Sequence, residues 1–113
     1  MNGSDFQSLL EDSFERLREL TDTKGVEYAA SHDQLANFKR HGKRLGMTPE
    51  AVLLVYLAKH TDAIESYVRG LSEGNPVQLS EPIFGRIDDA MLYLALLRAL
   101  LFDAAVHGPI QDD

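Results

Sequence analysis

The sequence predicts a single all-α domain with a four-helix bundle-like core. Apolar residues recur at helical spacing in four segments, residues that start and stop helices bracket those segments, and almost no strand pattern occurs. The chain has 113 residues, 44% apolar and 26% charged, which suits one domain with a modest core. We therefore expect residues 1–113 to form one domain with flexible ends at about 1–3 and 109–113.

The first helix is expected to begin near Ser4 and to run to about Leu20. Ser4 and Gln7 have the spacing of a capping box, in which two side chains satisfy backbone N–H groups at a helix start. Apolar residues then continue at helical spacing: Phe6, Leu9, Leu10, Phe14, Leu17 and Leu20. The segment TDTKG, residues 21–25, is turn-like and is expected to follow the helix.

A short second helix is expected after a second capping box, formed by Ser31 and Gln34. It carries Phe38 and a run of basic residues. Gly42 weakens this helix, and Gly46 is expected to terminate it.

The third helix has the clearest start in the chain. Thr48, Pro49 and Glu50 supply a cap, a first-turn proline and a first-turn acid. The segment AVLLVYLAKHTDAIESYVRG follows, so the helix is expected to end at Gly70.

The fourth helix is expected after a connection at residues 71–79 that contains a GNP turn. Ser80, Glu81 and Pro82 repeat the start pattern, and the helix continues until His107, where Gly108 and Pro109 follow. Four helices, two of them long and broadly apolar, cannot all bury their apolar faces in a thin monomeric layer. We therefore expect self-association to complete the core.

Composition excludes several classes of function. The formal net charge of −7 argues against sequence-independent binding of duplex DNA, which relies on an extensive basic surface. The absence of cysteine excludes disulfides, thiolate metal sites and thiol nucleophiles. The N-terminus MNGSDFQSLLEDSFERL lacks a secretory signal pattern, so we expect a cytoplasmic protein. The longest apolar run, residues 90–106, is too short and too charged to span a membrane comfortably.

Basic residues are concentrated in the segment NFKRHGKRLG, which contains Lys39, Arg40, Lys43 and Arg44. One interpretation is a solvated helix face. The other is a binding site for phosphate, because Lys and Arg supply positive charge and donate hydrogen bonds that phosphate oxygens accept.

Acidic residues mark the start of the most apolar segment. Glu81 and Asp89 lie eight residues apart on one helix row, Asp88 lies beside that row, and Asp62 and Glu65 are three apart on the preceding helix. If the two helices are antiparallel, these acids converge and suit Mg²⁺, which prefers carboxylate oxygens.

A structural interpretation of the same charges stays open. Glu81 would favour the helix N-terminus, Arg86 would pair with Asp89, and Asp88 would face solvent. Neither a P-loop nor a G-x-G-x-x-G motif is present, so any nucleotide site must be built from helices and side chains.

Four segments together resemble a known family: KGVEY at residues 24–28, LANF at 35–38, KHTDAIESY at 59–67 and SEPIFGRIDDAMLY at 80–93. They are similar to small MazG-like proteins encoded by phages, within the all-α NTP pyrophosphatase superfamily and its relatives associated with nucleotide modification. The resemblance implies a helical homodimer or higher homo-oligomer in the host cytoplasm. It also implies Mg²⁺-dependent cleavage of a nucleoside triphosphate to monophosphate and pyrophosphate.

The resemblance also implies roles for individual residues. The implied metal ligands are Asp62, Glu65, Glu81, Asp88 and Asp89, and the implied catalytic residues are Asp62, Glu81 and Asp89. Substrate contacts fall to Lys24, Asn37, Lys39, Lys59, His60 and Arg86. The chain departs from the family's pattern of E-E-x-x-E on one helix and E-x-x-D on the next. On the third helix only Asp62 and Glu65 are available for the first motif, and on the fourth helix Phe84 follows Glu81 by three residues.

Some of these residues have a plain structural alternative. Asn37 fits a local cap as well as a contact to a base or ribose, and His60 fits a packing role as well as proton transfer. Tyr28, Phe38, Tyr56 and Tyr93 fit a core as well as base stacking. Two other functions therefore remain open, a non-catalytic nucleotide binder and a helical oligomeric interaction protein.

Overall fold

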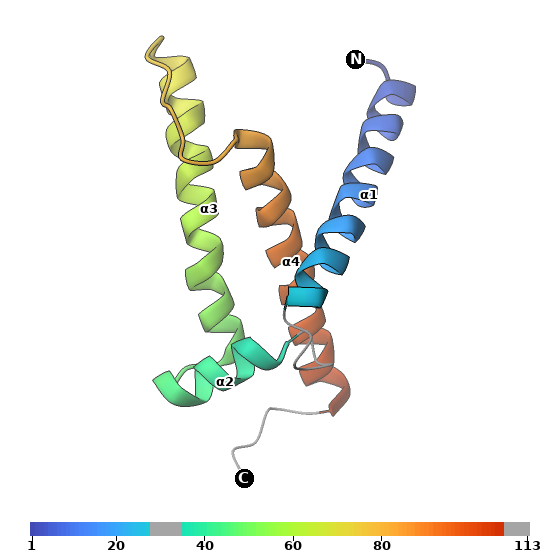
Figure 1. Cartoon of the computed structure of the whole chain (residues 1–113), viewed down its shortest axis with the longest axis vertical. Coiled ribbons are helices and arrows are strands. Elements are labelled where there is room, and N and C mark those ends of the chain that lie inside the picture. Colours follow the sequence, from blue (N-terminus) through green and yellow to red (C-terminus); the bar gives the residue numbers. More distant parts are fainter. Residues whose placement is uncertain (28–34, 108–113) are drawn as a thin grey trace. The chain divides into compact units, whose positions relative to one another are not determined.

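The computed structural model describes residues 1–27 and 35–107, and the side chains of 1–22 and 35–106 among them. It contains four helices, α1 (Gly3–Glu27), α2 (Ala36–Leu45), α3 (Pro49–Ser72) and α4 (Ile83–His107), and no strand within the described residues (Figure 1). The prediction of an all-α fold with four helices is thereby confirmed. Residues 1–34 and 35–113 form two compact units, which we describe separately.

The first unit consists of α1, which is longer than the sequence predicted. The segment TDTKG continues the helix, and the predicted end near Leu20 is wrong. The Thr21 hydroxyl donates to the Leu17 carbonyl oxygen at 2.8 Å, so this side chain bonds within the helix instead of turning the chain. The cap is also earlier than expected, because Asn2 Oδ1 accepts from the Asp5 N–H at 2.8 Å.

Helix α2 begins the second unit and ends where the sequence indicated. Gly46 has the left-handed conformation, with φ 68°, and the Met47 N–H donates to the Gly42 carbonyl at 2.8 Å. Gly42 is needed for close packing, because a Cβ there would lie 2.6 Å from the Met47 carbonyl oxygen. The predicted capping pair Ser31 and Gln34 lies outside the described residues.

The predicted start of α3 is confirmed, but its predicted end is wrong. Thr48 Oγ1 accepts from the Ala51 N–H at 3.2 Å, and Pro49 is the first helical residue. The helix passes Gly70 and ends at Ser72. Gly70 is buried because the following connection packs onto it: the Asn75 N–H donates to its carbonyl at 2.8 Å, and a Cβ would lie 2.7 Å from the Asn75 carbonyl oxygen.

Helix α4 begins at Ile83 and continues to His107, as predicted. Pro82 directly precedes the helix, and its carbonyl accepts from the Arg86 N–H at 3.1 Å. The Ser80 side chain does not supply the predicted cap, because its hydroxyl accepts from the Arg86 guanidinium at 3.4 Å.

The core of the second unit lies where α3 and α4 run side by side and α2 packs on the first turns of α3 (Figure 1). The buried cluster consists of Phe38, Val52, Leu53, Leu57, Ala90 and Leu100. The rings of Phe38, Tyr56 and Tyr93 pack against one another, with centroids 5.9 to 6.5 Å apart. These three aromatic residues therefore follow the packing interpretation, while Tyr28 lies outside the described residues.

Large apolar side chains also remain exposed on α4. Phe84 is 75% exposed and Leu101 is 55% exposed. Within the described part of the chain, no helix combines the length and the apolar character needed to cross a membrane. The self-association expected from the sequence stays a prediction.

We predict opposite effects for two glycine substitutions. Gly42→Ala should lower the free energy of unfolding by about 1–3 kcal/mol, because its methyl group meets a backbone oxygen at 2.6 Å that cannot easily move. Gly85→Ala, in α4, meets nothing within 4 Å and should raise stability by about 0.5–1 kcal/mol. Urea unfolding of both variants measures this; stabilisation by Gly42→Ala would show that the α2–α3 turn is not closely packed.

Candidate functional site

Two polar side chains are buried together between α3 and α4. Arg86 is 6% exposed and His60 is 8% exposed. Arg86 Nη1 lies 3.2 Å from His60 Nδ1, a hydrogen bond between residues 26 positions apart in the chain. The connection between α3 and α4 reverses the chain and brings the two residues together (Figure 1).

This hydrogen bond defines the state of the imidazole. A guanidinium group only donates, so His60 Nδ1 accepts and the ring proton resides on Nε2. The Tyr93 ring stacks on the imidazole, with centroids 5.3 Å apart and planes 30° apart. His60 is therefore held from one side by an arginine and from another by an aromatic ring.

Two carboxylates and a hydroxyl surround this pair. Asp89 Oδ2 lies 4.0 Å from His60 Nδ1, and Glu81 Oε2 lies 3.6 Å from Arg86 Nε. The Ser80 hydroxyl accepts from Arg86 Nη2 at 3.4 Å. We call these five residues, His60, Ser80, Glu81, Arg86 and Asp89, the α3–α4 polar cluster.

The cluster keeps His60 neutral near pH 7. Burial lowers the pKa of His60 below its ordinary value of 6.5, because the charged ring loses hydration. The Asp89 carboxylate opposes this shift, Arg86 adds to it, and the smaller effects of Glu81 and Lys59 are opposite in sign. Burial, Arg86 and Lys59 together outweigh the two acids, so the net direction of the pKa is downward.

The structure brings together four of the residues to which the sequence assigned a role: His60, Glu81, Arg86 and Asp89. Asp62 and Glu65 occupy exposed positions on α3, and Asp88 is half-buried beside Asp89. Among the described residues, no group of three carboxylates or imidazoles is arranged to hold a metal ion. The single chain thus places two of the five predicted metal-holding acids in the cluster.

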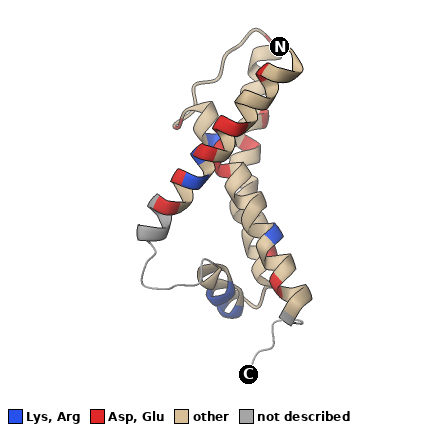
Figure 2. Ribbon diagram, turned by 90° about the vertical axis from the view of Figure 1, so that its right-hand side faces the viewer, with Lys and Arg blue, Asp and Glu red and all other residues tan. Residues whose placement is uncertain are grey.

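The basic segment lies near the start of α3, away from the α3–α4 polar cluster at the middle of that helix. Helix α2 carries basic residues and no acidic residue (Figure 2). Its Lys39 Nζ lies 3.2 Å from Asp103 Oδ2 of α4, and Asn37 Oδ1 accepts from Arg40 Nη2 at 2.8 Å, a local contact. Pro49, next to this region, and His60 are about 16 Å apart along the helix axis. Lys39 and Asn37 are therefore not part of the α3–α4 polar cluster within one chain.

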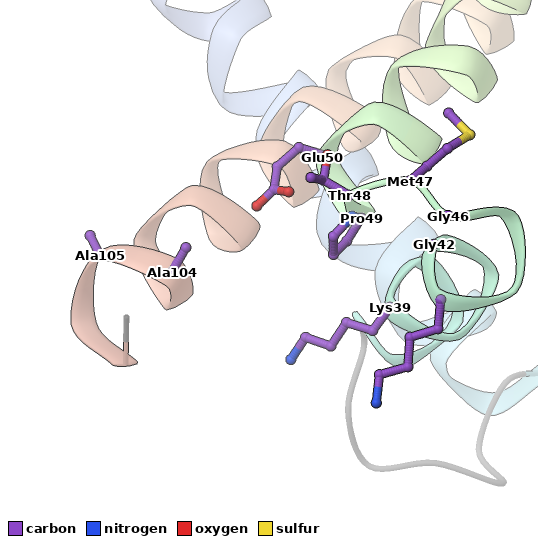
Figure 3. A pocket seen from close by; sticks show the side chains of 10 residues that line it. Lys39, Gly42, Gly46, Met47, Thr48, Pro49, Glu50, Ala104 and Ala105 are labelled. Carbon is purple, nitrogen blue, oxygen red and sulfur yellow. The ribbon is translucent and has the colours of Figure 1, made fainter. Parts of the chain in front are cut away.

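A cavity of about 690 Å³ opens beside the basic segment. Its lining comes from α2, the α2–α3 turn, the start of α3 and the last part of α4. Lys39 and Glu50 extend from α2 and α3 on the side where Ala104 and Ala105 of α4 lie (Figure 3). The cavity thus carries both signs of charge.

Two lysines, Lys59 and Lys24, were also predicted to contact the substrate. Lys59 is exposed and next to His60 in sequence, close enough for its charge to act on the imidazole. The side chain of Lys24 lies outside the described residues, so its predicted role is not addressed.

Sequence reasoning missed the burial of Arg86 and the role of Ser80 as its acceptor. A signal existed in the spacing, because Arg86, Ala90 and Tyr93 follow one another at intervals of four and three, on the face of α4 that packs against the core. Because arginine side chains are mostly exposed in proteins, this spacing was not sufficient to predict that Arg86 is buried.

The cluster offers three kinds of chemistry. The guanidinium binds oxyanions, the carboxylates suit a divalent cation, and the neutral imidazole holds a proton at a defined nitrogen. In comparisons with known proteins, no family model matches this chain, and no curated protein and no solved structure matches it.

The pKa of His60 predicts a specific loss of stability in acid. The unfolded chain binds the proton with the ordinary pKa of 6.5, whereas the folded chain binds it only at lower pH. The unfolded state therefore holds more protons in that window, and stability should fall as the pH drops through 6.5 towards the folded-state pKa.

His60→Gln removes this group but retains an oxygen that accepts from Arg86. Urea unfolding of both proteins between about pH 5 and pH 8 should show a shallower pH dependence for the variant. The other histidines are common to both proteins and cancel in the comparison. Equal slopes would mean that burial does not depress the pKa of His60.

Proposed function

We propose that this protein is a Mg²⁺-dependent nucleoside triphosphate pyrophosphohydrolase of the MazG-like kind, and that the α3–α4 polar cluster is its site. One observation carries the proposal: Glu81 and Asp89 lie beside the buried His60–Arg86 pair. The resemblance of KHTDAIESY and SEPIFGRIDDAMLY to MazG-like proteins supports it, because these segments supply all five residues of the cluster. The same resemblance favours phage nucleotide metabolism in the host cytoplasm.

The donor set of the cluster fits Mg²⁺. This ion commonly takes one or two protein carboxylates and completes its shell with water and substrate phosphates. Glu81 and Asp89 would hold it, since the side chain of Glu81 is 51% exposed and that of Asp89 is 19% exposed. When bound, the ion neutralises phosphate charge and activates a water molecule.

The chain's own side chains would perform the remaining tasks. Arg86 donates hydrogen bonds to phosphate oxygens and orients them, because its guanidinium is fixed by His60 and Ser80. His60 presents a proton on Nε2, and the stacked ring of Tyr93 holds the imidazole in place. A carboxylate that does not hold the cation would accept the proton of the attacking water.

A second function has a specific observation in its favour. The exposed apolar side chains of α4, among them Phe84 and Leu101, favour a helical oligomeric interaction protein. Such a protein would use the polar cluster to position α3 against α4 and would not respond to nucleotides. A third alternative is a non-catalytic nucleotide-binding protein, which would bind nucleotides at the cluster without hydrolysing them.

The leading proposal predicts metal-dependent pyrophosphate release from at least one nucleoside triphosphate. Glu81→Gln and Asp89→Asn should each lower the rate by about tenfold or more, because each removes a charged oxygen donor from the metal. Glu73→Gln is the matched control: Glu73 directly follows the helix that carries His60, about 20 Å further along its axis, and the rate of this variant should be unchanged.

A thermal-shift panel of nucleotides with and without Mg²⁺, followed by pyrophosphate detection, measures binding and turnover together. Stabilisation without pyrophosphate release would leave a nucleotide binder in place of an enzyme. No shift with any nucleotide would exclude both and favour the interaction protein.

A further inference from the structure

Arg86 has one buried donor without an acceptor. Among the described residues, Nε has no hydrogen-bond partner, although the whole residue is only 6% exposed. A carboxylate oxygen, Glu81 Oε2, lies 3.6 Å from Nε, which is within range of an ion pair but too far for a hydrogen bond. A buried donor of this kind is costly unless something accepts from it.

The open donor lies on the edge of the guanidinium that binds oxyanions. Nη1 is taken by His60 at 3.2 Å. The hydrogens on Nε and Nη2 point along one edge, where an oxyanion accepts two parallel hydrogen bonds. That edge is faced only loosely, by Ser80 at 3.4 Å from Nη2 and by Glu81 at 3.6 Å from Nε.

Glu81 is suited to leave this edge. It precedes α4, whose hydrogen bonding begins with the Pro82 carbonyl, so a change in the Glu81 side chain does not disturb the helix. Its side chain is 51% exposed, whereas that of Arg86 is 8% exposed. An ion pair with one exposed member is weak, and a ligand with better geometry displaces it.

We infer that Glu81 is a replaceable internal counter-ion of Arg86, and that a phosphate oxyanion takes its place at Nε and Nη2. The ligand class is a phosphate oxyanion, either of a nucleotide or of free pyrophosphate. This inference deepens the proposed function and rests on it for the identity of the ligand.

The exchange has a consequence for the order of binding. When a phosphate occupies the edge of Arg86, the Glu81 carboxylate is released and becomes available to Mg²⁺. Phosphate binding therefore favours metal binding, and by linkage metal binding favours phosphate binding to the same extent.

The test is binding of inorganic pyrophosphate in EDTA, measured by titration calorimetry without any metal. Glu81→Gln should bind about two- to fivefold more tightly than the unmodified protein, because a competing carboxylate is gone. Arg86→Lys should bind about tenfold more weakly or worse, because it lacks the two-donor edge. Arg98→Lys, at an exposed position of the same helix, and Glu73→Gln should bind like the unmodified protein.

Equal or weaker binding by Glu81→Gln would overturn the inference, and so would an equal gain in Glu73→Gln, which would mean that overall charge is responsible. Absence of metal-free binding to the unmodified protein would overturn it as well. Glu81→Gln decides the matter even if Arg86→Lys fails to fold, since Glu81 is half exposed.

The proposed function fails separately, through absence of pyrophosphate release with Mg²⁺. In Glu81→Gln the two readouts should move in opposite directions, with tighter metal-free binding and slower metal-dependent hydrolysis.

Discussion

The hydrogen bond between Arg86 and His60 is the constraint on which the second compact unit depends. The guanidinium of the buried residue Arg86 cannot lose its charge, so its surroundings must compensate for the lost hydration. A neutral imidazole, a hydroxyl and two carboxylates do so, and they come from both sides of the α3–α4 interface. The cluster therefore fixes how α3 and α4 lie along each other. An apolar core is more tolerant of small axial shifts, because its contacts are not directional.

Those features of the fold that depend on local chemistry could be predicted from the sequence. Thr48 caps α3 and Gly46 ends α2 because a side-chain oxygen and a left-handed residue act within a few positions. Features that depend on tertiary contact could not be predicted in this way. Gly70 was interpreted as a stop, but it is a glycine because Asn75 approaches its backbone. Thr21 is an exception, because its hydroxyl bonds back within α1, a local contact that its turn-like sequence does not indicate.

The candidate site was predicted in part for the same reason. Helical spacing on two antiparallel helices was sufficient to expect Glu81 and Asp89 close to the residues around His60. Spacing also placed Asp62 and Glu65 on one face of α3, but it does not say which face meets α4, and the structure leaves both exposed. Arg86 is buried because its position on α4 faces the core. An apolar residue is normally expected at such a position, so residue type alone does not predict a buried arginine there.

The connection between α3 and α4 sets the rotation of α4. Its first part is held against α3 through Gly70 and Asn75, and Gly74 adopts a left-handed turn with φ 67°. Only the few residues after Asn75 remain to position the helix start. Each residue of an α-helix turns the chain by about 100°, so a one-residue change in this short span could present another side of α4 to α3. Length variation in this connection is thus a more sensitive test of the architecture than most substitutions in the helices themselves, because it would exchange a buried cation for a neighbouring side chain.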